Sequence, residues 1–198
     1  MDLPVCDGEA TFITGPTLSG RRRLLHRTLR ESPGQPAMVA TREPADSVRS
    51  RYRRLTEGDE SDPVVVDCIT NSLGRSPDDT TSTKYAQSPE NLTSIGMKFA
   101  DVLEERRTDQ LSVGLTNLSP LLVYTSPSDV FQFVNILVQK SIGTGWSVFV
   151  TIDPTVHDAS TVQQFVPLFD AVIETRRTDD GDQELRVRKP EQTDWEAF

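Results

Sequence analysis

The chain has 198 residues, enough for one α/β domain with a core, and 30 acidic against 21 basic residues give it a net charge of −9. An acidic chain is a poor general binder of DNA, and no apolar run approaches the roughly 18 residues of a membrane helix. The N-terminal residues contain no apolar stretch of the kind found in secretory signals. We therefore expect a cytoplasmic protein without membrane contact, for which nucleic acid is a poor partner.

Most of the basic residues are arginines, because lysine occurs only at Lys84, Lys98, Lys140 and Lys189. An acid excess with few lysines is typical of adaptation to molar salt, where a Debye length of about 3 Å screens carboxylate repulsion. The arginines of the first third are interpreted either as solvated helix faces or as a site for an anionic ligand or partner. They are Arg21, Arg22, Arg23, Arg27, Arg30, Arg49, Arg51, Arg53 and Arg54.

Strands and helices alternate along the first part of the chain. The first strand is a short β-rich run that ends at Gly15, and the helix after it starts near Ser19 with leucines at helical spacing. The third strand is a continuous apolar run of the kind that is buried in a parallel sheet. These predictions give strands at 10–14, 37–41 and 64–69 and helices at 18–29 and 45–55.

Residues 71–88 are rich in Ser, Thr and Asp and show no periodicity, so they are predicted to form a long mobile loop. Pro89 suits the first turn of a helix whose apolar face starts at Leu92, and Ser128 is predicted to cap a later helix. Residues 179–182, with the sequence DDGD, indicate the turn of a β-hairpin. The remaining predictions are strands at 111–115 and 146–152, helices at 129–141 and 162–168, and hairpin strands at 170–175 and 184–188.

This order of elements predicts an α/β fold. Parallel sheets in such chains are covered by helices on both faces, so we expect one three-layer α/β/α domain over residues 1–190, with a mostly parallel sheet and a C-terminal β-hairpin. Residues 191–198 form a polar tail. Trp195 and Phe198 in this tail are expected to dock on the body of the protein or on a partner.

A nucleotide-binding motif lies between the first strand and the first helix, where residues 15–22 read GPTLSGRR. A functional phosphate loop reads GxxxxGK[ST]. Its backbone N–H groups cradle phosphates, its Lys reaches the β- and γ-phosphates, and its hydroxyl holds Mg²⁺. Gly15 and Gly20 have the required spacing and position. The Lys is replaced by Arg21, whose planar guanidinium has a different reach, and the hydroxyl residue is replaced by Arg22.

Three interpretations of this loop stay open. It is a strand–turn–helix connection with glycines for geometry alone, a retained site for a nucleotide or another phosphate, or an active hydrolytic site. Arg22 cannot ligate Mg²⁺, and Pro16 lacks a backbone N–H. No cofactor is therefore assigned, and ATP with Mg²⁺ is kept as the alternative ligand. The candidate phosphate-binding residues are Gly15, Ser19, Gly20, Arg21 and Arg22.

Six stretches carry a resemblance to a known family: FITGP at 12–16 with Ser19 and Gly20, PENLTSIG at 89–96, LSPLLVY at 118–124, VFQF at 130–133, IDPTVHD at 152–158 and LFDAV at 168–172. In these stretches the chain resembles the RecA/KaiC-like branch of P-loop ATPases. It is most similar to haloarchaeal proteins described as RecA-superfamily ATPases implicated in signal transduction. The order and spacing of the stretches, which span most of the chain, are more specific than any one of them.

The resemblance implies which parts of the ATPase chemistry are missing. Active members end the strand equivalent to residues 111–115 in an Asp that helps to position Mg²⁺, and Thr116 stands there in this chain. Active members also carry a Glu after the second strand that orients the attacking water. The corresponding stretch keeps one acid, Glu43, which also fits a solvated loop position. Because phosphoryl transfer depends on such positioning and charge neutralisation, loss of hydrolysis is favoured, and Glu43 is the catalytic candidate if activity remains.

Asp153 and His157 follow the strand at 146–152, at the edge where open α/β sheets bind ligands. They are interpreted as residues that order this loop, with a ligand contact as the alternative. Cys6 and Cys68 are far apart and lack CxxC spacing, which is typical of buried, unreactive thiols in a reducing compartment. No metal site is predicted.

The leading hypothesis is a degenerate, non-hydrolysing RecA/KaiC-like ATPase homologue that acts as a regulatory or protein-interaction module. Signal transduction is the context that the resemblance implies, and the expected partner is another protein or a second copy of the chain. One alternative is a nucleotide-binding or weakly active ATPase that uses Arg21 in place of the Lys. Another is a transcription-linked module that uses the Arg-rich helices, although no helix-turn-helix pattern supports it.

Overall fold

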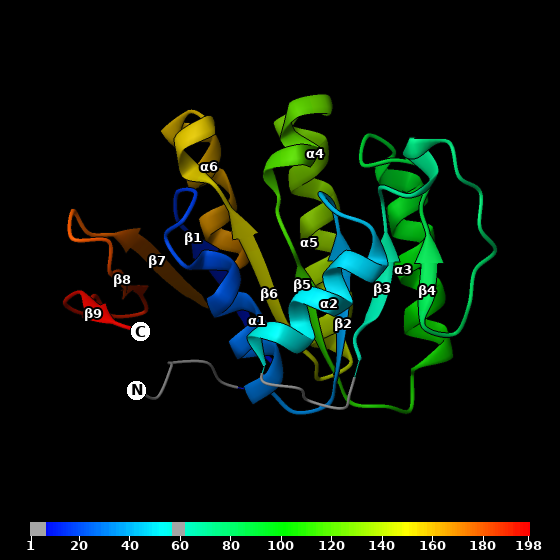
Figure 1. Cartoon of the computed structure of the whole chain (residues 1–198), viewed down its shortest axis with the longest axis horizontal. Coiled ribbons are helices and arrows are strands. Elements are labelled where there is room, and N and C mark those ends of the chain that lie inside the picture. The colour runs from blue at the N-terminus through cyan, green and yellow to red at the C-terminus, as the bar shows by residue number, and fades with distance from the viewer. Residues whose placement is uncertain (1–6, 57–61) are drawn as a thin grey trace.

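The computed structural model describes residues 7–56 and 62–198, so Cys6 lies outside the described residues. Within these residues a nine-stranded sheet has the strand order β4-β3-β2-β5-β6-β1-β7-β8-β9. The pairs from β4 through β7 are parallel, whereas β8 and β9 join as antiparallel strands. Figure 1 shows α1 and α2 in front of the sheet and α3 and α5 behind it.

The strands of the sheet are short, and the central ones are buried along their whole length because helices cover both faces. Their bounds are β1 (Ala10–Thr14), β2 (Gln35–Ala40), β3 (Val64–Asp67), β4 (Thr83–Tyr85), β5 (Leu111–Leu115), β6 (Ser147–Ile152), β7 (Ala171–Arg177), β8 (Gln183–Lys189) and β9 (Glu196–Ala197).

The helices follow the strands in alternation, with three short 3₁₀ segments η1 to η3 among the described residues. Their bounds are α1 (Arg21–Glu31), α2 (Ala45–Leu55), η1 (Asn71–Leu73), α3 (Leu92–Glu105), α4 (Ser119–Tyr124), α5 (Pro127–Gly143), η2 (Pro154–Val156), α6 (Ala159–Phe165) and η3 (Val166–Leu168). In the part of the chain that the structure describes, none of these helices has the length and apolar content to cross a membrane.

The core has two halves, one on each face of the sheet, because successive strand side chains point to opposite sides. Phe12 of β1 joins the larger half with α3, α5 and α6, and its ring stacks on that of Phe169 with 4.7 Å between centroids. Ile13, the next residue, joins the smaller half with the leucines of α1 and with Tyr52 of α2. The predicted three-layer α/β fold with a mostly parallel sheet and a C-terminal hairpin is thereby confirmed.

Residues 71–88 are more ordered than the predicted mobile loop. They contain η1 and the edge strand β4, which pairs in parallel with β3. Lys84 of β4 donates to Glu105 of α3 at 2.5 Å. A strand of three residues is too short to show alternation, and this explains why periodicity did not predict it.

Helix ends also differ from the sequence predictions. Ser126, not Ser128, caps α5 by accepting a hydrogen bond from the Asp129 N–H at 3.2 Å, and Pro127 occupies the first turn. The short helix α4 before it was not predicted. The tail does dock on the body of the protein: β9 pairs with β8, and Phe198 packs against the smaller core half.

Candidate functional site

The loop at residues 15–20 joins β1 to α1 and is closed by contacts within the protein. The Gly15 N–H donates to the Ile152 carbonyl at 3.2 Å, and the Ser19 N–H donates to the Pro16 carbonyl at 3.3 Å. The Ser19 hydroxyl is fully buried and lies 2.6 Å from that of Thr175 on β7. A side chain at position 15 would collide with these two hydroxyls, so glycine is required there by packing alone.

Arg21, at the position of the phosphate-binding Lys, is turned back into the protein. Its Nη1 donates to the carbonyl of Gly15 and, at 2.8 Å, to that of Ile152. The same atom lies 3.5 Å from Asp153 Oδ2, and both side chains are almost fully buried. Burial lowers the pKa of Arg21, while the charge of Asp153 raises it in part. The cation that would meet a phosphate is therefore already paired.

Asp153 accepts several hydrogen bonds on this side of the loop. Its carboxylate accepts hydrogen bonds from the Thr17 hydroxyl at 3.1 Å and from the N–H and hydroxyl of Thr155 at 3.1 and 2.6 Å. Burial raises the pKa of Asp153, but the Thr155 hydrogen bonds and the nearby Arg21 outweigh burial, so that the pKa lies below its usual value. The predicted loop-ordering role of Asp153 is consistent with this geometry.

The outer side of the loop is covered by the C-terminal strands. Gly20, the residue before α1, has φ = 85°, and a side chain there would come within 2.7 Å of Gln183 Oε1 and of the Phe198 ring. Gln183 Nε2 also donates to the Leu18 carbonyl at 3.0 Å. Arg23 donates to the Phe198 carbonyl and lies over the Phe198 ring, 4.8 Å from its centroid. The first turn of α1, where a phosphate would sit, faces protein groups.

Arg22 belongs to a second group of residues, on the side of the loop toward β2 and β5. With His26, Glu43 and Thr116 it lines a closed space of about 10 Å³. Burial lowers the pKa of Arg22, partly offset by the charge of Glu43. Burial also lowers the pKa of His26 to about 4, and His26 Nδ1 has no hydrogen-bond partner among the described residues.

Glu43 and Thr116, the residues predicted at the positions of the catalytic Glu and the metal-binding Asp, both have structural partners. The two Glu43 carboxylate oxygens each accept a hydrogen bond from Arg51 at 2.9 Å. Burial raises the pKa of Glu43, but the Arg51 hydrogen bonds outweigh it and lower the pKa overall. The Thr116 hydroxyl accepts a hydrogen bond from the Thr41 N–H at 3.2 Å, so it ties the end of β5 to the end of β2.

His157 lies near Asp153 but forms no hydrogen bond with it in the described part of the chain. Burial lowers the pKa of His157 while Asp153 and Asp158 raise it, with burial the stronger effect. His157 lines a cavity of about 290 Å³ together with Gly15, Glu174 and Trp195. Among the described residues no three His, Cys, Asp or Glu side chains form a group able to hold a metal ion.

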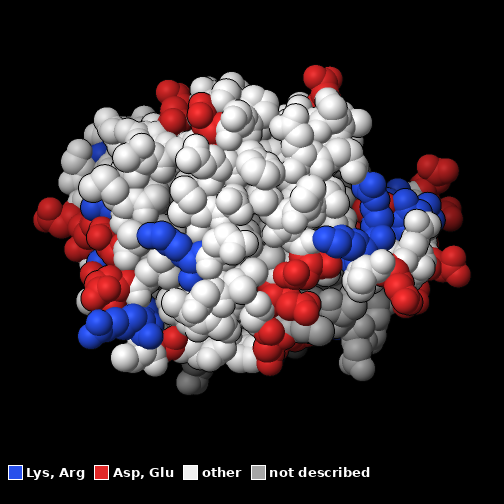
Figure 2. Space-filling model, turned by 180° about the vertical axis from the view of Figure 1, so that it is seen from behind, with Lys and Arg blue, Asp and Glu red and all other residues white. Residues whose placement is uncertain are grey.

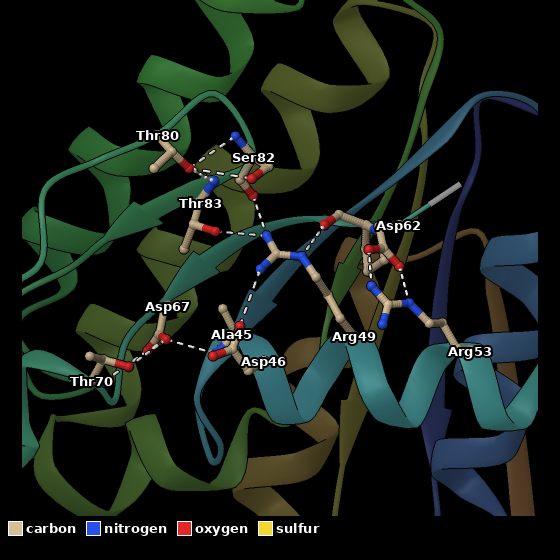
Figure 3. Close-up of polar contacts among 11 residues, drawn as sticks. Ala45, Asp46, Arg49, Arg53, Asp62, Asp67, Thr70, Thr80, Ser82 and Thr83 are labelled. Carbon is tan, nitrogen blue, oxygen red and sulfur yellow. Dashed lines mark hydrogen bonds and ion pairs between the residues drawn. The ribbon is translucent and has the colours of Figure 1, made fainter. Parts of the chain in front are cut away.

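A polar cluster that the sequence did not single out fixes the start of α2 (Figure 3). Asp67 ends β3, is fully buried, and accepts hydrogen bonds from the N–H groups of Ala45, Ile69 and Thr70 at 2.7 to 2.9 Å. In the sequence, the signal for this role of Asp67 is an acidic residue at the end of the apolar run 64–66.

Three arginines of α2, one of the Arg-rich helices, contact other groups of the protein. Arg49 bridges α2 to the Ser82 carbonyl and the Thr83 hydroxyl, at 2.6 and 2.7 Å, and Arg53 pairs with Asp62, as Figure 3 shows. Arg51 is held by Glu43. These contacts favour the interpretation of the arginines as structural side chains over the interpretation as an anion site.

The strand order and the β1–α1 loop give this chain an α/β fold of the kind found in KaiC-like proteins. The fold is similar to that of a KaiC-like protein from the hyperthermophilic archaeon Pyrococcus horikoshii, with a TM-score of 0.66 and 12% identity over 98% of this chain and 87% of the other. It is also similar to an uncharacterized protein from Pyrococcus horikoshii, solved in complex with an unknown peptide, with a TM-score of 0.68 and 15% identity over 93% and 85% of the two chains.

The family follows from the sequence itself. The model of DUF7504, a family of unknown function, matches residues 8–175, so the chain belongs to that family. Among curated proteins no sequence matches this chain significantly. The matched range includes the loop at residues 15–22, Thr116 and Asp153, and it stops within β7, before the strands that cover the loop.

Proposed function

We propose that this protein is a non-hydrolysing relative of the RecA/KaiC-type ATPases that acts as a regulatory or protein-interaction module in signal transduction. The observation that carries this proposal is the position of Arg21. Its guanidinium occupies the carboxyl ends of β1 and β6 and is neutralised by Asp153 at 3.5 Å. A nucleotide phosphate would have to displace a buried ion pair, and that displacement would leave Asp153 without its cationic partner.

The other catalytic positions support the same proposal. Arg22 offers no oxygen ligand for Mg²⁺, and Thr116 is used as a hydrogen-bond acceptor between two strand ends. Glu43 is held by both of its oxygens on Arg51, so the guanidinium fixes the orientation of this carboxylate. Hydrolysis needs metal, phosphate clamp and oriented water together, and the residues for the metal and the clamp are replaced here.

The protein-interaction role draws on a different observation. The uncharacterized Pyrococcus horikoshii protein of similar fold was solved in complex with an unknown peptide, and this supports a polypeptide as the partner. The competing role in transcription is disfavoured because Arg49, Arg51 and Arg53 are engaged with protein groups. The competing role as a nucleotide binder requires Arg21 to leave all its partners.

Isothermal titration calorimetry with ATP and Mg²⁺ in high salt tests the proposal. We expect no saturable heat and no phosphate release above the buffer rate from the intact chain. The variant Arg21→Lys, which restores the residue of a functional loop, is expected to bind no ATP either, because Arg22, Thr116 and the cover of Phe198 remain.

Saturable micromolar binding that disappears in Arg21→Ala or Gly20→Asp, with circular dichroism unchanged, would contradict the proposal and favour a nucleotide-gated protein. Phosphate release that disappears in Glu43→Gln would instead show an active ATPase. Each variant is compared with Leu73→Asp, a change at an exposed side chain of η1 that lies outside the loop.

A further inference from the structure

The helices on the two faces of the sheet differ in charge. On one face, α1 and α2 carry Arg at many positions. On the other, α4 and α6 carry no charged residue, and the 17 residues of α5 include only Asp129 and Lys140 as charged residues, whereas α3 carries Lys98, Asp101, Glu104 and Glu105. Charged residues make up 26% of the chain, so the composition of α4, α5 and α6 departs strongly from the whole. Figure 2 shows that uncharged side chains cover a broad central and upper area of this face.

A groove runs along this face between α3 and α5. Its volume is about 790 Å³, and it is lined by Gly96, Ala100 and Leu103 on α3 and by Gln132 and Ile136 on α5. The space above Gly96 is open, since a side chain added there would meet no atom within 4 Å. Ile136 is 47% exposed at the border of the groove. A groove with both polar and apolar lining beside an exposed Ile is suited to receive an amphipathic helix.

The groove has an acidic end and a basic end. Glu90 and Asp129 lie where α3 and α5 begin, and Lys140 lies near the end of α5. None of the three forms an ion pair within the described residues, whereas Lys84 pairs with Glu105 and Lys98 with Asp79. At a rise of about 1.5 Å per residue, Asp129 and Lys140 are separated by about 16 Å along α5.

We propose that a second copy of this chain docks in this groove, with the two α5 helices antiparallel across a two-fold axis. This inference rests on the proposed function, because it takes the chain to be a module that binds protein. In the antiparallel arrangement Lys140 meets Asp129 of the partner subunit, and the symmetry forms the same pair a second time. Ile136 then enters the partner's groove beside the small residues of α3.

Charge is the reason for choosing a second copy in this orientation. A parallel arrangement would bring Lys140 against Lys140 of the partner subunit, and Asp129 against its own equivalent. The antiparallel arrangement pairs the charges of Asp129 and Lys140 and also opposes the two helix dipoles. An isolated helix from another protein would also fill the groove, but nothing in that case would require one acidic and one basic end on the same face.

Light scattering coupled to size exclusion, over a concentration series of the intact chain, measures the proposed dimer. We expect a mass that rises to that of a dimer, and a monomer at all concentrations in Ile136→Asp. Leu18→Asp is the matched control, because it places the same charge at an exposed side chain of the β1–α1 loop, outside the groove. A monomer at every concentration overturns the proposal, as does a dimer that survives Ile136→Asp.

Charge exchange tests the orientation. Lys140→Glu and Asp129→Lys are each expected to weaken the dimer at least tenfold, and the double variant is expected to regain most of the loss. Circular dichroism of each variant checks that the fold is retained. A double variant no better than the single ones overturns the antiparallel arrangement. Nucleotide binding is measured at the loop of residues 15–20, so a failure of the dimer and a failure of the proposed function give separate signals.

Discussion

At the scale of single residues, the loop shows how one substitution changes the meaning of a motif. Arg21 has the charge of the Lys that it replaces, but its planar guanidinium donates to two carbonyl groups and pairs with Asp153. A lysine ammonium is a point charge on a flexible stem and is not matched to this set of acceptors. The motif therefore keeps its spacing and charge while its cation serves the stability of the fold.

His26 is the residue for which the structure predicts a pH dependence. Burial lowers its pKa from the usual 6.5 to about 4, so between these values the unfolded chain binds the proton more tightly than the folded chain. The contribution of His26 to the free energy of unfolding is fully present above pH 6.5. It is lost as the pH drops toward 4, by about 3 kcal/mol in total. We expect His26→Leu to remove this part of the pH dependence in urea unfolding measured across that range.

The matched control is His157→Leu, because the chain has only these two histidines and His157 is partly exposed. His157→Leu is expected to remove a smaller part of the pH dependence than His26→Leu, because Asp153 and Asp158 oppose the effect of burial on the pKa of His157. If the stability of His26→Leu still declined as steeply between pH 6.5 and 4, carboxylates and not His26 would cause the loss of stability at acid pH.

At the scale of elements, α2 depends on a residue that is not part of it. Asp67 at the end of β3 accepts hydrogen bonds from the N–H of Ala45, the first residue of α2, and from two N–H groups of the following turn. The strand end, the turn and the helix start are thus held by one buried carboxylate. This position also explains why β3 ends at Asp67, two residues before the end of the predicted strand.

Removal of this cap is expected to be strongly destabilising. Asp67→Ala leaves three backbone donors near the core without an acceptor, and we expect it to lower the free energy of unfolding by about 3 to 5 kcal/mol. Asp46→Ala is the control on the same helix, because the Asp46 side chain is fully exposed and its ion pair with Arg49 spans 3.9 Å. Asp46→Ala is expected to lower the free energy of unfolding by about 0.5 kcal/mol or less. Equal effects in urea unfolding would refute the capping role.

Elements with long, clear patterns could be predicted from the sequence, and those without could not. The strands at 10–14 and 111–115 and the helix at 45–55 have the predicted bounds. β4 and β9 escaped prediction because two or three residues carry no period, and their pairing comes from the neighbouring strand. The partners of Arg21 and Glu43 lie on other elements, so the sequence gives the residue types but not the closed contacts that they make.

At the scale of the whole molecule, charge is unevenly divided between the two helical faces while the total stays at −9. The arginines of α2 are largely paired, whereas acids remain in excess elsewhere, for example in the turn at residues 179–182. Repulsion among these acids opposes the compact state at low salt and is screened within about 3 Å at 1 M.

We therefore expect salt to stabilise the protein. Raising KCl from millimolar to molar concentration should increase the thermal midpoint by on the order of 5 °C, since exposed ion pairs contribute little and lose little on screening. Replacing Asp179, Asp180 and Asp182 by Asn should raise the thermal midpoint at low salt and so reduce the increase that KCl produces. Calorimetry at both salt concentrations measures these midpoints. A midpoint that falls as salt is added would contradict this account.

The tight surroundings of Gly15 and Gly20 have a consequence for how this sequence tolerates mutation. Both glycines are needed by contacts with Thr175, Ser19, Gln183 and Phe198, which involve no ligand. A saturation library selected only for folding would therefore keep both glycines while accepting changes at the exposed Leu18. A phosphate-loop pattern can thus outlast nucleotide binding, because the part of the pattern that a sequence search recognises is the part that the folded chain itself requires.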